Sequence, residues 1–594
     1  MNNYLSYPFD ANLILRKKKS IRKMLLDEGE FIEKRIAVLG GSTTSEIKDI
    51  LELFLLHEKI KPVFYESEFN KYYEDIVFDN PKLAAFSPEF IYIHTTSANI
   101  NFPLEPDGNN EFVERKINDE FLRFKGLWLK IREKYHCPVI QNNFEFPFYR
   151  VLGNLDASNI QGKTYFINRL NLSFARYAQE NKDFYINDIN YLSSWFGLEK
   201  WCDRTHWHSY KYAFSYEAIP MLSYNIANII KAIYGKAKKC LILDLDNVLW
   251  GGVIGDDGIE NIKIGKESPE SEAYSEFQQF IKELKKRGVI LAVCSKNDSK
   301  IAKEGLSHID NILKFDDFTA FRANWEEKIG NIVDIAKEIN IGLDSIVFID
   351  DNPAEREHVK LNLKDVAVPN VGDNIINFLP ILDKAGYFEP AVISSDDIQR
   401  QAYYKENQKR DEHQKNFGDY ESFLKSLEMK AEVRSFIPLY LDRITQLINK
   451  TNQFNLTGKR YSYSEIEAIS QGTGYITLYG RLSDKFGDNG LVSVIIGRIK
   501  DLHELHIDLW LMSCRVLKRG MELVMFDTLV SLCKEKGIKR IIGYYQKTNK
   551  NNMVSLHYQQ LGFERISESK DCDLTMWQYH VPSQYALKNT VIQL

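Results

Sequence analysis

The sequence predicts a multidomain α/β protein, in which two parallel-sheet α/β domains precede an α+β domain. Its 594 residues suffice for three or four domains of roughly 100–200 residues each. Up to about residue 390, short apolar runs alternate with helical segments, which is typical of parallel sheets covered by helices. In the last part of the chain, alternating apolar and polar residues predict an antiparallel sheet.

Composition excludes several classes of protein. With 44% hydrophobic and 27% charged residues, the chain has the composition of a soluble globular protein. A net charge of -5 argues against a nucleic-acid partner, and no stretch of 18 apolar residues predicts a membrane span. The basic run "RKKKSIRK" lacks the apolar core of a signal peptide. Seven scattered cysteines without a CxxC pair suit a reducing compartment, so we expect a cytoplasmic protein.

The first predicted domain covers residues 1–235. Its strands are "KRIAVLGG" (34–41), "EFIYIHTT" (89–96) and "CPVIQNNF" (137–144), with helical patterns between them. The segment "TYFINRLNLSFARYAQEN" has helical spacing, and "DFYINDINYLSSWFG" predicts a strand followed by a helix. This order predicts a parallel, layered sheet.

The second predicted domain covers residues 236–390. The runs "CLILDLD", "GVILAVCS" and "DSIVFIDD" are continuously apolar up to their last residues, as expected of central parallel strands. Residues 391–430 are charged with helical periodicity and predict a helical connector. The third domain, 431–594, contains the alternating segments "YITLYGRLSD", "GLVSVIIGRIK" and "ELHIDLWLMS", then a helix, the strand "RIIGYYQKTN" and another helix.

Two aspartates follow the first of these apolar runs. A side-chain period of two along a strand predicts Asp244 and Asp246 on the same face. Two adjacent carboxylates repel each other and are costly to desolvate, so a metal ion is the expected counter-charge.

Further polar residues end or follow comparable strands in order: Ser295, Lys328, Asp350 and Asp351. Ligands of open α/β sheets bind beyond the carboxyl ends of the strands. For a phosphate ester, one carboxylate can attack phosphorus and its neighbour can protonate the leaving oxygen. A hydroxyl and an ammonium can hold the phosphoryl oxygens, and hard carboxylate oxygens select Mg²⁺.

These motifs resemble those of the haloacid dehalogenase (HAD) superfamily of phosphotransferases: "DLDNVLW", "VCSKND", Lys328 and "FIDDNP". The resemblance implies Asp244 as nucleophile, Asp246 as acid/base, and Ser295 and Lys328 as phosphate binders. It implies a Mg²⁺ site made by Asp244, Asp246 (through its backbone carbonyl), Asp350 and Asp351. About 40 residues separate the first two motifs, which leaves no room for a large cap domain, and the glycines of "WGGVIGDDG" suit a short mobile flap.

The longer run "DLDNVLWGGVIGDDG" resembles the FkbH-like branch of that superfamily, in which an acetyltransferase (GNAT)-like domain follows the phosphatase-type domain. The resemblance implies removal of phosphate from a phosphoglyceryl donor and transfer of the glyceryl group to an acyl carrier protein. "WLMSCRVLKRGME" (510–522) is the matching stretch, with Cys514 as the acyl-bearing thiol, and "SLHYQQLGFE" resembles the closing segment of that fold. "RVLKRG" is expected to open a helix that binds a pyrophosphate or phosphopantetheine. The alternative for Cys514 is a buried small hydrophobe.

A third resemblance concerns the first domain. Ser42 in "AVLGGST" with Asp203 and His206 in "CDRTH" resembles the triad of SGNH-type esterases. The chain departs from that pattern, because "GGS" replaces "GDS" and the residues of the oxyanion site are not evident, with Asn142 and Asn143 as candidates. Helix capping is the alternative role of Ser42.

The preferred hypothesis is therefore a Mg²⁺-dependent phosphatase that takes a phosphorylated small molecule and loads a carrier protein. The alternatives are a simple phosphatase of a small sugar or polyol phosphate, with flanking domains that recognise substrate, and a non-catalytic scaffold in a biosynthetic pathway.

Overall fold

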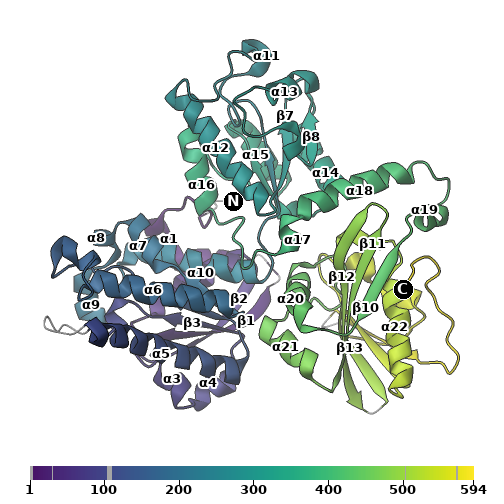
Figure 1. Cartoon of the computed structure of the whole chain (residues 1–594), viewed down its shortest axis with the longest axis horizontal. Coiled ribbons are helices and arrows are strands. Elements are labelled where there is room, and N and C mark those ends of the chain that lie inside the picture. Colours follow the sequence, from purple (N-terminus) through teal and green to yellow (C-terminus); the bar gives the residue numbers. More distant parts are fainter. Residues whose placement is uncertain (1–3, 28, 30, 103–109, 502, 570–572) are drawn as a thin grey trace. The chain divides into compact units, whose positions relative to one another are not determined.

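A computed structural model describes residues 4–27, 29, 31–102, 110–501, 503–569 and 573–594. These residues divide into two compact units. Figure 1 labels their helices and strands. Unit 1 is the chain up to Ile233 together with Ser462–Glu465, and unit 2 is Tyr234–Tyr461 together with Ile466–Leu594. The sheets of both units agree with the predicted mixed α/β class. No described helix is long and apolar enough to cross a membrane.

Unit 1 contains a five-stranded, fully parallel sheet in the order β2-β1-β3-β4-β5. Its strands are β1 (Ile32–Gly40), β2 (Ile60–Glu66), β3 (Phe90–His94), β4 (Val139–Asn142) and β5 (Phe184–Asn187). Its helices are α1 (Ala11–Asp27), α2 (Ser45–His57), α3 (Glu74–Val77), α4 (Pro81–Phe86), α5 (Asn110–Tyr135), α6 (Lys163–Glu180), α7 (Ile189–Phe196), α8 (Leu198–Trp201), α9 (Arg204–Tyr210) and α10 (Ile219–Ile233).

Helices cover both faces of this sheet. Phe124 and Trp128 of α5 pack with Phe174 of α6 against one face, in an aromatic core. Helix α10 lies against α2 and α1 on the other side. Strand β2 was not among the predicted strands. Its sequence "IKPVFYE" contains Pro62 and is only partly buried, so it lacks the continuous apolar run of a central strand.

The part of unit 2 that corresponds to the second predicted domain has a four-stranded parallel sheet in the order β8-β7-β6-β9. The strands are β6 (Cys240–Leu243), β7 (Ile290–Ser295), β8 (Ala320–Ala323) and β9 (Ile346–Ile349). The helices are α11 (Ile254–Asp257), α12 (Pro269–Lys286), α13 (Ser299–Gly305), α14 (Lys328–Ile339), α15 (Pro353–Asn362) and α16 (Phe378–Lys384).

Alternate residues of β6 enter different cores on the two faces of the sheet. Leu241 and Leu243 pack with residues of α12 and α16, whereas Cys240 and Ile242 pack with residues of α14 and α15. The strand is therefore buried on both faces, as its unbroken apolar run predicts. This burial fixes the position of the residues that follow β6.

The segment predicted as a helical connector forms α17 (Ser395–Ile398), α18 (Arg400–Gln414) and α19 (Tyr420–Ser426). A seven-stranded sheet follows, in the order β10-β11-β12-β13-β14-β16-β15, and it is antiparallel except for the pair β13–β14. Its strands are β10 (Lys430–Arg434), β11 (Tyr475–Asp484), β12 (Gly487–Asp501), β13 (Glu504–Met512), β14 (Arg540–Gln546), β15 (Glu564–Ser569) and β16 (Leu574–His580). Its helices are α20 (Leu441–Lys450), α21 (Tyr463–Gln471), α22 (Met521–Glu535) and α23 (His557–Gln560).

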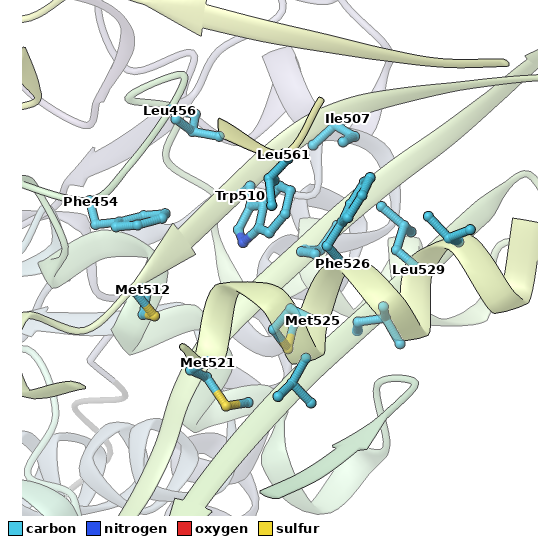
Figure 2. Close-up of a cluster of buried hydrophobic side chains, with 14 of the residues drawn as sticks. Phe454, Leu456, Ile507, Trp510, Met512, Met521, Met525, Phe526, Leu529 and Leu561 are labelled. Carbon is cyan, nitrogen blue, oxygen red and sulfur yellow. The ribbon is translucent and has the colours of Figure 1, made fainter. Parts of the chain in front are cut away.

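Strands β13 and β14 separate after the pair Ile507–Gly543. The segment around Leu456 occupies the gap, because the Leu456 N–H donates to the Trp510 carbonyl and the Gln546 N–H donates to the Leu456 carbonyl. Figure 2 shows the core beneath this point, where Trp510 and Phe526 of α22 lie together. The end of β13, which leads to Cys514, thus rests on a continuous apolar core.

Candidate active site

Acidic residues gather at the carboxyl ends of β6 and β9. Leu243 and Ile349 are paired neighbours, so Asp244 and Asp350 follow their strands at the same level. The Asp244 N–H donates to the Ile349 carbonyl at 3.0 Å, which locks this register. The predicted meeting of these two side chains at one edge of the sheet is therefore observed.

Lys328, the first residue of α14, joins the two acids. Its buried Nζ donates to Asp244 Oδ2 and to Asp350 Oδ2, each at 2.5 Å. Burial alone would lower the pKa of Lys328, but Asp244 and Asp350 raise it above its usual value. The lysine is consequently held as an ammonium between two carboxylates.

One ammonium does not balance the acids present. Carboxylate oxygens of Asp244, Asp350 and Asp351 lie within 4.8 Å of one another. Burial and the neighbouring Asp244 raise the pKa of Asp350 to about 6, although Lys328 opposes the shift. Burial and Asp244 also raise the pKa of Asp351. Three carboxylates facing one ammonium leave an excess negative charge that a cation would neutralise.

This donor set fits Mg²⁺. All three residues offer hard oxygen ligands, which Mg²⁺ prefers at about 2.1 Å. Ligand oxygens of an octahedral ion lie roughly 3–4 Å apart at that bond length, so the cluster needs little contraction to hold one. With Lys328 charged, the cluster has the net charge of a dicarboxylate.

The carboxylate of Asp246 lies outside this cluster. Its Oδ1 accepts from the Trp250 indole at 2.9 Å and from the Ile254 N–H, and its Oδ2 accepts from the Asn297 side chain at 3.0 Å. Strand β6 ends at Leu243 and Asn247 has a φ of 55°, so the strand's period of two does not extend to Asp246. Both aspartates therefore follow the strand, and Asp244 and Asp351 are near enough to Asp246 to raise its pKa. Metal binding by the Asp246 backbone carbonyl stays a prediction.

These contacts orient the Asp246 carboxyl and shift its proton affinity. Burial raises the pKa of Asp246, and the negative charges of Asp244 and Asp351 raise it further. The hydrogen bonds from Ile254 and Trp250 lower it, but by less. A raised pKa suits a group that must hold a proton before giving it up. Trp250 and Asn297 were not among the predicted site residues, although they lie within the motifs "DLDNVLW" and "VCSKND".

Ser295 is the last residue of β7, where it is buried and paired in register with Ala323. Among the described residues, no hydrogen bond joins its hydroxyl to the acidic cluster. Arg356, which no motif had indicated, donates through Nη1 to the carbonyls of Asp350 and Asp351 at 2.7 and 2.6 Å. This buried guanidinium fixes the loop that carries both acids.

The predicted flap is anchored at its first residue and held together by an internal hydrogen bond. Trp250 is buried, and the Val253 N–H donates to the carboxylate of Asp257 in α11. Gly252 has a φ of 94°, and an added Cβ would meet that carboxylate at 2.6 Å. Glycine is therefore required at the turn into the flap.

The second predicted constellation, in unit 1, is only partly assembled. Asp203 caps the N-terminus of α9, and its Oδ2 lies 3.3 Å from His206 Nδ1. Ser42 follows β1, and its buried hydroxyl has no hydrogen-bond partner among the described residues. In the described part of the chain, no hydrogen bond joins Ser42 to His206. The side chain of Asn142 is buried, and its Oδ1 accepts hydrogen bonds from Tyr92 and Asn187.

Cys514 lies just beyond β13, in the short 3-10 turn Cys514–Val516. It is half-buried, with Sγ 3.7 Å from the Asn340 carbonyl. The segment "RVLKRG" leads directly into α22, which begins at Met521 with Gly520 as its N-cap at a φ of 85°. Binding of a pyrophosphate or phosphopantetheine by this helix start stays a prediction. Within the described residues, the six cysteines are free, and Cys572 lies outside them.

Two family models match the chain. Residues 35–231 match the N-terminal domain of FkbH, and residues 239–368 match the NLI interacting factor-like phosphatases. The N-terminal part of the protein BF1531 from Bacteroides fragilis, which contains a phosphatase domain complexed with Mg, is 30% identical with a TM-score of 0.58. The match covers 64% of this chain and 99% of that structure.

Two acetyltransferases are more distant. The ribosomal-protein-S18-alanine N-acetyltransferase from Escherichia coli is 11% identical with a TM-score of 0.21, over 27% of this chain and 99% of its own. An acetyltransferase of the GNAT family from Streptococcus pneumoniae is 15% identical with a TM-score of 0.22, over 26% of this chain and 100% of its own. Scores this low carry no argument about the last domain. No curated protein matches the chain.

Proposed function

We propose that this protein is a Mg²⁺-dependent phosphatase of a phosphoglyceryl-type donor. The chain belongs to the family of the Bacteroides fragilis protein, and it joins an FkbH N-terminal domain to a HAD-type phosphatase domain. We further propose that the Cys514 thiolate attacks the acyl phosphate carbonyl of such a donor, which breaks the acyl–oxygen bond, releases phosphate and forms a thioester. Thiol exchange would then pass the glyceryl or a similar small acyl group to the phosphopantetheine thiol of an acyl carrier protein in the cytoplasm and restore Cys514. The observation that carries the first half is the contact of Lys328 with Asp244 and Asp350 at the edge of the acidic cluster.

In the proposed reaction, a carboxylate oxygen of Asp244 attacks phosphorus, and the bond from phosphorus to the leaving oxygen breaks. Asp246 gives its proton to that oxygen, which its raised pKa supports, while the hydrogen bonds that it accepts from Trp250 and Asn297 orient the carboxyl group. Asp246 then accepts a proton from the water that attacks the aspartyl phosphate, which releases phosphate and restores Asp244.

Lys328 keeps Asp244 ionised and offers its positive charge to the phosphoryl oxygens as the charge on the carboxylate is consumed. Ser295, at the neighbouring strand end, is the proposed second phosphate binder. Mg²⁺ held by Asp244, Asp350 and Asp351 would shield the phosphate charge from the attacking carboxylate.

The test of the hydrolytic half measures phosphate release from bisphosphoglycerate with Mg²⁺. Asp244→Asn should abolish release, whereas Asp334→Asn, on the exposed surface of α14, should leave it unchanged. Undiminished turnover by Asp244→Asn would refute the assignment of the nucleophile.

The transfer half rests on the position of Cys514 beyond β13, where the thiol is not buried in the core. Its test is the mass of a holo carrier protein after incubation with chain, donor and Mg²⁺. We expect a gain in carrier mass of the size of a glyceryl group, which Cys514→Ala abolishes and Cys202→Ala preserves.

If Cys514→Ala leaves all measured turnover unchanged, the simpler phosphatase of a sugar or polyol phosphate is the better description. If no donor forms a phosphoenzyme, the scaffold hypothesis replaces both.

A further inference from the structure

A cavity of about 440 Å³ lies within unit 2, far from the acidic cluster. Lys239, just before β6, and Leu343–Ser345, just before β9, form one side of it. The acidic cluster follows the opposite ends of the same strands. From Lys239 to Asp244 the extended chain spans roughly 16 Å at 3.3 Å per residue. The cavity is therefore separate from the proposed phosphatase site.

The described residues that line the cavity carry more positive than negative charge. The cations are Lys239, Arg400, Arg443, Lys450, Arg515 and Lys550. The carboxylates are Asp344, Asp365, Asp396 and Asp397. Six cations against four anions give a formal charge of +2, which matches the charge of a phosphate monoester near neutral pH, about -2.

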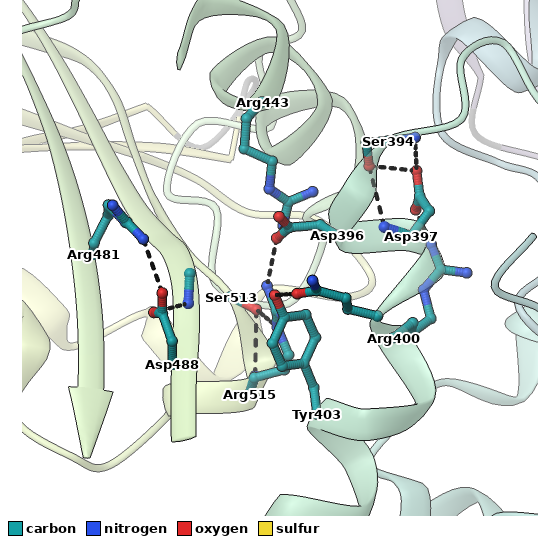
Figure 3. A network of polar contacts seen from close by, with 12 residues as sticks. Ser394, Asp396, Asp397, Arg400, Tyr403, Arg443, Arg481, Asp488, Ser513 and Arg515 are labelled. Carbon is teal, nitrogen blue, oxygen red and sulfur yellow. Dashed lines mark hydrogen bonds and ion pairs between the residues drawn. The ribbon is translucent and has the colours of Figure 1, made fainter. Parts of the chain in front are cut away.

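Most of these charges are paired within the protein (Figure 3). Asp397 forms ion pairs with Arg400 and Lys450. Burial alone would raise the pKa of Asp397, but the two cations lower it below its usual value. Asp396 lies 2.9 Å from Arg443 and 3.7 Å from Arg515. Lys550 pairs with Asp344. These pairs hold the walls of the cavity in place.

Lys239 differs from the other cations. Among the described residues, no hydrogen bond or ion pair reaches its ammonium group, while its backbone is fixed by bonds with Ser345 and Ile290. Burial lowers the pKa of Lys239, and Arg400 lowers it further, against Cys514. The Nε of Arg443 is also buried without a hydrogen-bond partner. Asp344 also raises the pKa of Lys239, but no carboxylate of the described residues pairs with its ammonium directly. A half-buried ammonium without a direct ion pair is costly, and a bound anion would reduce that cost.

Part of the lining is less polar. It contains Phe454, Met512 and the half-buried Cys514, while the Arg515 guanidinium lies over the Tyr403 ring at 4.4 Å. An anionic group can thus bind to the cations of the lining while an uncharged portion of the same ligand contacts the apolar residues.

We propose that this cavity is a second ligand site, which binds the phosphate group of an organic phosphate through Lys239, with the Cys514 thiol in its wall. The choice of an organic phosphate rests on the transfer half of the proposed function. Two sources offer a phosphate group: a free phosphorylated small molecule, as a monoester with a charge of about -2, and the phosphopantetheine arm of a carrier protein, as a diester with a charge of about -1. Binding at Lys239 is measurable whether or not Asp244 is a nucleophile.

The experiment uses the full chain without Mg²⁺ and measures the rate at which iodoacetamide alkylates Cys514, by peptide mass spectrometry. The probes are inorganic phosphate, phosphoglycerate and pantetheine 4′-phosphate. We expect saturable protection of Cys514 by phosphate, with no protection of Cys202. Stronger protection by pantetheine 4′-phosphate identifies the carrier arm, and stronger protection by phosphoglycerate identifies the free molecule.

Charge variants decide whether Lys239 is the binding group. Lys239→Met should weaken protection about ten- to hundredfold, the range for loss of one charged hydrogen bond. Lys239→Arg should retain protection, which separates loss of charge from misfolding. Lys337→Met, on the exposed face of α14, is the matched control and should behave as the wild type. Absence of protection by every probe, or equal protection in Lys239→Met, would overturn the proposal.

Discussion

At the scale of single residues, the ammonium of Lys328 is the group on which the two strand-end acids depend. Its single positive charge forms ion pairs with both Asp244 and Asp350, which are buried. Lys328→Met would leave these carboxylates facing each other without a counter-charge, which is costly in a buried site. We predict a fall in phosphate release of about a hundredfold or more, the usual effect of losing one group that stabilises developing charge. Lys337→Met, on the same helix, should retain activity, and equal activity of the two variants would contradict the role of Lys328.

Glu145, in unit 1, is predicted to make stability depend on pH. Burial raises its pKa to about 7, although hydrogen bonds from Ser97 oppose the shift. The folded state therefore retains a proton that the unfolded state loses near pH 4.5. Its contribution to stability is complete below that pH and is lost as pH rises towards 7, by roughly 2 to 3 kcal/mol.

Glu145→Gln tests this dependence because it keeps the shape and removes the titration. Thermal unfolding between pH 5 and pH 8 should show a smaller loss of stability in the variant than in the wild type. Identical pH profiles would mean that the carboxyl does not hold its proton in the folded protein.

The residues of the acidic cluster were predictable because each stands where an apolar run ends. The proximity of Asp244 and Asp350 follows from the rule that the carboxyl ends of parallel strands lie at the same edge of the sheet. The side-chain direction of Asp246 was not predictable, since it depends on the turn at Asn247 and on contacts with Trp250 and Asn297. Arg356 binds through carbonyl groups of the loop, for which the sequence has no recognisable pattern.

At the scale of elements, prediction succeeded where burial is continuous. Strands β6, β7 and β9 are buried at every position and were visible as apolar runs. Strand β8 has only four residues, "AFRA", with the two central ones half-buried, and it was missed. So short a strand is recognisable only from its partner β7, which pairs with it in register.

The packing of α22 against the last sheet gives a stability prediction. Leu529 is fully buried in the core that surrounds Trp510 (Figure 2). Leu529→Ala should destabilise unit 2 by about 2–5 kcal/mol, because it removes apolar contacts and leaves a cavity. Glu535→Ala, at the exposed end of the same helix, should change stability by less than about 0.5 kcal/mol. A small effect of Leu529→Ala in thermal unfolding would contradict the packing described here.

At the scale of the whole molecule, the cavity beside Cys514 shows why a second site is difficult to predict from sequence. Lys239, Asn340, Arg443 and Cys514 are separated by up to 275 positions of the chain numbering and meet only in the folded unit. No local motif connects them. The acidic cluster also joins distant residues, but each belongs to a motif that is recognisable alone.

The division into two compact units leads to a prediction about Mg²⁺ and unfolding. The acidic cluster belongs wholly to unit 2, whereas Glu145 belongs to unit 1. A ligand stabilises the folded state to which it binds, by about 2.7 kcal/mol at a hundred times its dissociation constant. Calorimetry of the full chain should therefore resolve two transitions, of which Mg²⁺ raises one and Glu145→Gln alters the pH dependence of the other. Asp351→Asn should reduce the Mg²⁺ effect, since it removes one of three carboxylates, while Asp334→Asn should preserve it. Equal shifts of both transitions by Mg²⁺, or no shift of either, would contradict a metal site confined to the ends of β6 and β9.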